Sequence, residues 1–215
     1  MKYFKNIFVL VLALFLVTGG VWLGLSNKGD MVLWFNSHRS VPLDFFFKYS
    51  THLGDGLVLI PLFIGLLLYR YYYGIVAVFT SLTILILSQG LKKTIFSGWP
   101  RPTAYFSPDI QWNYVEGVSV AMRNTFPSGH TISAWAVFFL LALVVNRRWA
   151  YILFPFLAIA VGLSRVYLLQ HFFVDTYFGA VLGVLATYAA FLITDRVLGQ
   201  DRKMKLLSKS PMAPS

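Results

Sequence analysis

One apolar stretch of the chain, Ser164–Asp175, contains three polar residues that could do chemistry together: Arg165, His171 and Asp175. Charged groups in or beside a membrane segment are costly, so they are functional candidates by default. If the segment is helical, His171 and Asp175 share one face, and the carboxylate accepts a hydrogen bond from one imidazole nitrogen. The other nitrogen then keeps its electron pair, as a nucleophilic histidine requires, and the planar Arg165 guanidinium suits phosphate. Taken alone, a charge cluster marking a helix end is an equally good interpretation.

A second segment has the features of an anion-binding helix start. Ser128 is a natural N-cap, and Gly129 allows close approach of the backbone where an apolar run begins. Free N–H groups at such a start bind anions. His130 lies in the first turn, where it could donate or take a proton beside a bound anion. The alternative for a lone histidine at this position is a cap or surface residue.

A third segment supplies positive charge ahead of these two. Lys92 and Lys93 close an apolar run, and Arg101 follows in the next loop. Together with Arg165 they could neutralise a dianionic group. A lysine pair at the end of a span also commonly extends only to the interface, so either lysine could serve that simpler role.

The composition is that of an integral membrane protein. Of 215 residues, 58% are hydrophobic and 12% are charged, whereas a soluble domain is about half apolar and a quarter charged. The absence of cysteine excludes a disulfide framework and a thiolate metal site. The net charge of +10 is better explained by cytoplasmic loops and phosphate-binding groups than by a nucleic-acid partner. No obligate protein partner is inferred.

Apolar runs of membrane-spanning length divide the chain into six expected spans. We expect an all-α integral membrane bundle that forms a single domain over residues 1–215, with short interfacial helices within 26–55 and a tight turn at Gly74. A polar loop is expected over 94–127 and a basic cytoplasmic tail over 202–215. The expected spans cover approximately residues 7–25, 57–69, 75–91, 129–145, 149–163 and 172–193.

Basic residues are distributed unevenly over this layout. The side that holds both termini carries ten basic and two acidic residues, and the other side carries eight basic and six acidic residues. The positive-inside rule therefore places the termini in the cytoplasm. The candidate residues then gather at the opposite face. We expect a multi-pass protein of the plasma (inner) membrane with its site on the periplasmic or extracellular side.

Two of the segments resemble motifs of a known family. Pro127–His130 (Pro-Ser-Gly-His) and Ser164–Asp175 (Ser-Arg-x5-His-x3-Asp) are similar to the second and third motifs of the type-2 phosphatidic acid phosphatase superfamily, which includes vanadium haloperoxidases and bacterial acid phosphatases. The family's first motif is a lysine, six residues and Arg-Pro. Here seven residues separate Lys93 from Arg101, and eight separate Lys92 from it. This departure leaves open which lysine reaches phosphate.

The resemblance implies catalysis without a metal or other cofactor. His171 would attack phosphorus and form a phosphohistidine, and Asp175 would orient His171. His130 would protonate the leaving oxygen and then activate water. The phosphate oxygens would be held by Lys93 or Lys92, Arg101, Arg165, the Ser128 hydroxyl and the Gly129 N–H.

Membrane embedding favours a lipid phosphate or pyrophosphate as substrate, because a lipid headgroup reaches the interface by lateral diffusion. Relatives suggest undecaprenyl pyrophosphate, phosphatidylglycerophosphate, phosphatidic acid or lipid A phosphate. The alternatives are a lipid-to-lipid phosphotransferase and a non-catalytic lipid-binding or transport protein. The second alternative is disfavoured because His171 is intact. Vanadate-dependent halide oxidation is disfavoured because enzymes of that type are larger and not built in the membrane.

Overall fold

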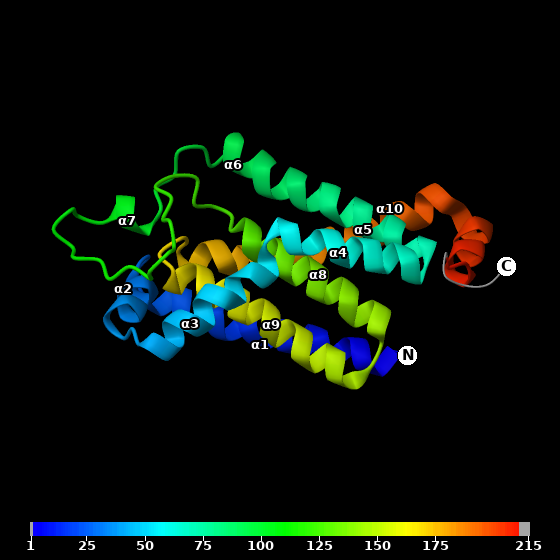
Figure 1. The fold of residues 1–215 in the computed structure, drawn as a ribbon, viewed down its shortest axis with the longest axis horizontal. Coiled ribbons are helices and arrows are strands. Elements are labelled where there is room, and N and C mark those ends of the chain that lie inside the picture. The colour runs from blue at the N-terminus through cyan, green and yellow to red at the C-terminus, as the bar shows by residue number, and fades with distance from the viewer. Residues whose placement is uncertain (1, 211–215) are drawn as a thin grey trace.

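Helices make up the regular structure of the chain (Figure 1). The computed structural model describes residues 2–210, and within this range no β-strand forms, only an isolated bridge between Pro100 and Arg123. The elements are α1 (Lys2–Leu25), α2 (Asp30–Ser37), α3 (Val41–Ser50), the 3-10 turn η1 (Thr51–Gly54), α4 (Gly56–Tyr69), α5 (Tyr71–Leu85), the π-helical turn η2 (Ile86–Gly90), α6 (Leu91–Lys93), α7 (Pro102–Tyr105), α8 (Gly129–Val145), α9 (Arg148–Tyr167) and α10 (Phe173–Ser208).

Several of these helices are apolar enough to lie in a membrane. Within the described part of the chain, α1, the continuous segment Tyr71–Lys93, α9 and α10 are long enough to cross a bilayer. Helices α4 and α8 have 14 and 17 residues, fewer than the roughly 20 that a full span needs. The all-α membrane fold is confirmed, and four of the six expected spans have full length.

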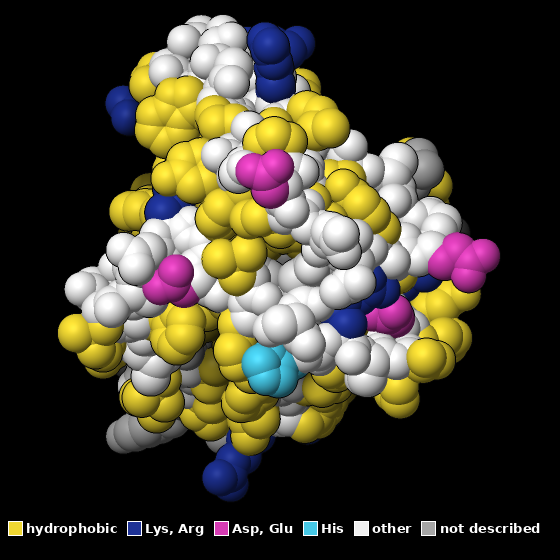
Figure 2. Space-filling model, turned by 90° about the vertical axis from the view of Figure 1, so that its left-hand side faces the viewer, with side chains coloured by type: hydrophobic (Ala, Val, Ile, Leu, Met, Phe, Trp, Pro, Cys, Tyr) yellow, Lys and Arg dark blue, Asp and Glu magenta, His cyan; other side chains and the backbone are white. Residues whose placement is uncertain are grey.

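The long helices run side by side along the longest axis of the molecule (Figure 1). Both termini lie at one end, and α2, α3 and α7 gather at the other. Figure 2 shows that second end, where hydrophobic side chains cover much of the surface and basic, acidic and histidine side chains lie among them. The short helices therefore occupy the end where an interfacial position was expected.

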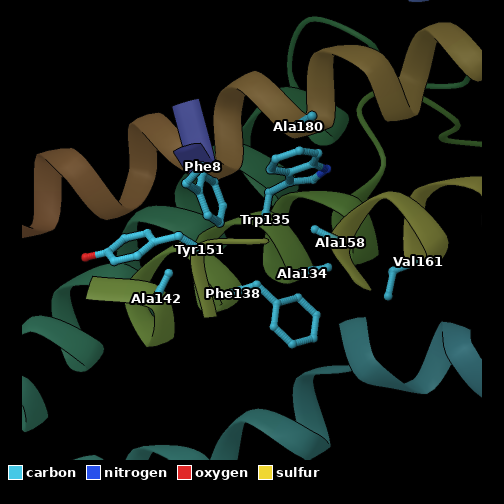
Figure 3. Close-up of a cluster of buried hydrophobic side chains, with 9 residues drawn as sticks. All are labelled: Phe8, Ala134, Trp135, Phe138, Ala142, Tyr151, Ala158, Val161 and Ala180. Atoms are coloured by element: carbon cyan, nitrogen blue, oxygen red, sulfur yellow. The ribbon is translucent and has the colours of Figure 1, made fainter. Parts of the chain in front are cut away.

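Helix α8 lies at the centre of the bundle and packs against both α9 and α10. Its Ala134 and Ala142 let the neighbouring helices approach, while Trp135 fills the space between them (Figure 3). Phe8 of α1 meets Trp135 edge to face, with ring centroids 5.9 Å apart. Burial of such rings is strongly stabilising, so this contact holds α8 against α1.

The turn expected at Gly74 lies elsewhere. Gly74 is helical within α5, and the chain reverses at Arg70, which has an extended backbone between α4 and α5. A Cβ at Gly74 would lie 2.5 Å from Leu67 Cδ1. Glycine here therefore serves the close packing of the helix pair rather than the turn itself.

The expected basic tail begins as a continuation of the last helix. Residues 202–208 belong to α10, which kinks at Gly199, where φ is 67°. After the kink, Lys203 Nζ lies 2.5 Å from Asp195 Oδ2, and an Arg70 guanidinium nitrogen donates to the Leu207 carbonyl. These contacts hold the helix end against the bundle. Residues 211–215 lie outside the described residues.

Candidate active site

The segment Ser164–Asp175 is not one continuous helix. Helix α9 ends and α10 begins within it, and Leu169 between them has a φ of 59°. The His171 N–H closes this turn by donating to the Arg165 carbonyl at 3.1 Å. His171 and Asp175 therefore do not share a helical face, because His171 belongs to the turn and Asp175 to the first turn of α10.

His171 and Asp175 nevertheless interact. His171 Nδ1 lies 3.2 Å from Asp175 Oδ2, and each residue is only 1% exposed. The same oxygen accepts the Phe172 N–H at 2.9 Å and the hydroxyl of Thr125. A carboxylate at a helix start is stabilised by such free N–H groups. With Nδ1 facing the carboxylate, Nε2 of His171 is the nitrogen left for other chemistry.

Ser128 precedes α8 but its side chain does not cap the helix. Its hydroxyl accepts a hydrogen bond from Thr131 Oγ1 at 2.9 Å, and its backbone N–H donates to the Asp175 carbonyl at 3.2 Å. Ser128 is therefore the N-cap residue of α8, as expected, but its hydroxyl bonds Thr131 and forms no capping hydrogen bond. Ser128 is fully buried. Gly129 and His130, in contrast, line a cavity.

The two adjacent lysines, Lys92 and Lys93, lie in different environments. Lys92 lines the same cavity, whereas Lys93 is exposed and does not. The preceding π-helical turn η2 shifts the helix face, because its hydrogen bonds run from i to i+5 instead of i to i+4. Arg101, after the loop, lines the cavity with Lys92. The structure thus brings one of the two candidate lysines to the site.

The cavity has a volume of about 260 Å³ and collects residues from all three segments. It is lined by Gly54, Gly56, Ser88, Gln89, Lys92, Arg101, Gly129, His130, Ser133, Arg165 and His171. An adjoining cavity of about 480 Å³ shares Arg101, His130 and Arg165, and adds His52 and Asp55, for which loop positions were expected. His130 and His171 therefore open into the same cavity.

Two carboxylates interact electrostatically with the cations of the cavity: Asp55 with Arg165, and Asp175 with Lys92 and Arg101. Hydrogen bonds to neutral groups hold two of these cations in place. Arg101 donates to Gln170 Oε1 at 2.7 Å, and Arg165 donates to Thr51 Oγ1 at 2.8 Å. Arg165 Nε is buried and has no hydrogen-bond partner within residues 2–210. Buried cations are costly unless an anion compensates them, so this arrangement suits a phosphate group.

Burial lowers the pKa of His171 well below its usual range, and the cations Arg101, Arg165 and Lys92 lower the pKa further. The imidazole is therefore neutral near pH 7. Burial also lowers the pKa of Arg101, although a guanidinium keeps its charge under ordinary conditions. The site thus combines a neutral imidazole with fixed positive charge, the two components that attack on a phosphoryl group requires.

Comparison with known proteins identifies the family. The sequence pattern of the PAP2 superfamily matches residues 57–198, more than half of the chain. The chain belongs to the PAP2 superfamily. Phosphatidylglycerophosphatase B of Bacillus subtilis (strain 168) is 30% identical over 169 residues, which cover 72% of this chain and 73% of that protein. The bacitracin transport permease protein BcrC of Bacillus licheniformis is 39% identical over 87 residues, 40% of this chain and 41% of that protein.

Solved structures of PAP2 proteins share the fold. LpxE of Aquifex aeolicus superposes with a TM-score of 0.66 at 25% identity, covering 77% of this chain and 94% of that chain. The PAP2 type phosphatidylglycerolphosphate phosphatase of Bacillus subtilis gives a TM-score of 0.60 at 23% identity, covering 88% and 96%. The expected family and enzyme class are confirmed: this is a membrane-embedded lipid phosphatase of the PAP2 superfamily.

Three polar residues of this PAP2 site were missed in the sequence: Thr51, Thr125 and Gln170. Thr51 lies 114 residues before its partner Arg165, so no local pattern could reveal it. Gln170 precedes His171 directly and holds Arg101, while its Nε2 donates to the Ser119 carbonyl at 2.7 Å. Proximity to the histidine motifs was the available signal for Thr125 and Gln170.

Proposed function

We propose that this chain removes the terminal phosphate of a membrane lipid through a phosphohistidine formed on His171. One observation carries the proposal: His130 and His171, distant in sequence, line a single cavity with Lys92, Arg101 and Arg165. A nucleophile, a proton donor and an anion-binding set are the parts that metal-free phosphoryl transfer requires.

In the first step, His171 Nε2 forms a bond to phosphorus while the bond from phosphorus to the lipid oxygen breaks. Asp175 accepts the hydrogen bond from Nδ1 and stabilises the positive charge that develops on the ring. His130 gives a proton to the leaving lipid oxygen. In the second step, a water attacks phosphorus and gives a proton to His130. The phosphorus–nitrogen bond breaks, and phosphate leaves.

Lys92, Arg101 and Arg165 hold the oxygens of the transferring group. The Gly129 N–H at the start of α8 adds a donor. These groups already carry charge or a fixed dipole before the substrate arrives, so they stabilise the transition state with little reorganisation. The Ser128 hydroxyl accepts from Thr131 and keeps its own proton, but the side chain is fully buried and does not line the cavity.

The membrane setting supports a lipid substrate. Because phosphatidylglycerophosphatase B matches 72% of this chain, we take phosphatidylglycerophosphate as the first candidate. Phosphatidic acid, lipid A phosphate and undecaprenyl pyrophosphate also carry a terminal phosphate, so they are the next candidate substrates.

We place the site on the outer face of the inner membrane. Both termini lie at the end of the bundle opposite α7 (Figure 1), and the side assigned to the termini is richer in basic residues. The positive-inside rule then puts the termini in the cytoplasm. A lipid reaching the outer leaflet would present its headgroup to the cavity.

The test is phosphate release by the purified protein in detergent, measured on the four lipids and on a soluble phosphate ester. We expect release from a lipid phosphate that persists with a metal chelator and is inhibited by vanadate. His171→Ala should lower kcat by a factor of about 10³ or more. Full activity of that variant would overturn the mechanism. Preference for the soluble ester would overturn the substrate class, and transfer of phosphate to a second lipid would identify a phosphotransferase.

A further inference from the structure

Thr125 is fully buried beside the catalytic histidine, yet it belongs to none of the three motifs. Its hydroxyl donates to Asp175 Oδ2, and its Oγ1 lies 3.4 Å from His171 Nδ1. The same carboxylate oxygen accepts the Phe172 N–H at 2.9 Å and faces His171 Nδ1 at 3.2 Å. Three donors therefore converge on one oxygen of Asp175.

This arrangement determines which nitrogen of His171 carries the proton. A threonine hydroxyl has one proton to donate. Because that proton goes to Asp175, Oγ1 of Thr125 presents only its lone pairs to His171 Nδ1. Both neighbours of Nδ1 are then acceptors, so the neutral ring is held with its proton on Nδ1. Nε2 keeps the lone pair that the attack requires.

The backbone around Thr125 also connects the histidine to the loop that holds phosphate. The Thr125 N–H donates to the Trp99 carbonyl at 3.3 Å, and Arg101 Nε donates to the Arg123 carbonyl at 2.9 Å. A bridge pairs Pro100 with Arg123 between these two contacts. These contacts hold the two loop segments side by side, with Arg101 in one segment and Thr125 in the other.

We propose that Thr125 is a positioning residue, which holds His171 in its Nδ1–H tautomer through Asp175 and aligns it with the loop carrying Arg101. The inference rests on the proposed function, because it takes His171 as the nucleophile. Thr125 is absent from the lining of the cavity and so does not touch the substrate. Its loss therefore affects the chemical step, measured by kcat, and leaves KM nearly unchanged.

The first test compares Thr125→Val, which removes the hydroxyl at similar volume, with Thr125→Ser, which retains it. We expect the valine variant to lower kcat for lipid phosphate release by about 10–100-fold, the range typical of groups that orient a catalytic ligand. The serine variant should keep most of the activity. Thr194→Val is the matched control, because Thr194 is equally buried and its hydroxyl donates to the Ala190 carbonyl at 2.7 Å within α10.

A double-mutant cycle separates positioning from general damage. If Thr125 acts through Asp175, Thr125→Val should lower kcat much less in the Asp175→Asn background than in the wild type. Thr125→Ala enters the same cycle if the valine variant does not fold. Wild-type kcat in Thr125→Val, equal losses in both backgrounds, or a serine variant as slow as the valine variant would overturn this inference. An active His171→Ala would instead overturn the proposed function, so the two failures are distinguishable.

Discussion

His171 Nδ1 and Asp175 Oδ2 lie 3.2 Å apart across the break between α9 and α10. The turn after α9 places the imidazole over the start of the next helix, where Asp175 occupies the first turn. A helix start has free N–H groups, and the Phe172 N–H holds the carboxylate in place at 2.9 Å. The contact between His171 and Asp175 thus joins a turn to the start of the next helix, and it does not depend on one continuous helix.

The two adjacent lysines should differ sharply in their importance. Lys92 lines the cavity, whereas Lys93 is exposed outside it. We expect Lys92→Ala to lower kcat/KM for lipid phosphate release by about 100-fold, as the loss of one transition-state donor commonly does. Lys93→Ala should remain near wild type. Equal losses in the two variants, or a larger loss at Lys93, would show that the loop is arranged differently.

The guanidinium of Arg165 should not be replaceable by an amine. One of its nitrogens donates to Thr51, and the buried Nε has no hydrogen-bond partner among the residues that the structure describes. Arg165→Lys keeps the charge but loses the planar fork, so we expect a drop in kcat/KM of about 100-fold and weaker inhibition by vanadate. Arg39→Lys, at a residue paired with Asp44 at 2.6 Å, is the control. Wild-type vanadate inhibition in Arg165→Lys would contradict the assignment.

Protein stability should fall in acid partly because of His171. Its pKa is well below the ordinary 6.5 in the folded protein, so between pH 7 and pH 5 the unfolded chain takes up a proton that the folded chain does not. Stability is then lost as the pH falls, by up to about 2 kcal/mol. His171→Asn should lose less over the same interval. The measurement is chemical unfolding in phosphate-free detergent buffer, and identical pH dependences would refute the burial argument.

Close packing under the site depends on Gly54. A Cβ there would lie 2.6 Å from the His130 carbonyl and 2.7 Å from Val161 Cγ1. Gly54→Ala should therefore displace the first turn of α8, lower stability by about 1–3 kcal/mol and reduce kcat. Gly65→Ala is the matched control, because nothing lies within 4 Å of its added Cβ. Thermal unfolding and phosphate release measure both effects, and equal behaviour of the two variants would argue against this contact.

The orientation of the bundle can be measured with reporters. A reporter fused after Arg148, near the end of the bundle where both termini lie, should be cytoplasmic. A reporter inserted near Ser107, beside α7, should be external. These expectations follow from the excess of basic residues assigned to the terminal side. The opposite pair of locations would place the site on the cytoplasmic face.

The predicted helices agreed with the structure where local signals were strong. The span expected over 129–145 is observed as α8, Gly129–Val145, because a Ser-Gly start and Asn146 in a left-handed conformation mark its ends. The last helix continues well past 193, since its apolar face resumes after the kink at Gly199 and packs back on the bundle. Local patterns fail there because contacts distant in sequence stabilise the extension.

The sequence by itself determined the membrane class, the family and the order of the histidine and arginine motifs, because hydrophobicity and motif spacing are local properties. Only the tertiary structure decided that Lys92 and not Lys93 reaches the cavity, and that Thr125 contacts the Asp175 carboxylate. Both depend on how helices pack: a π-helical turn changes the direction of one side chain, and a partner 50 residues away supplies the other contact. Such relations arise from the arrangement of whole helices, which no short stretch of sequence encodes.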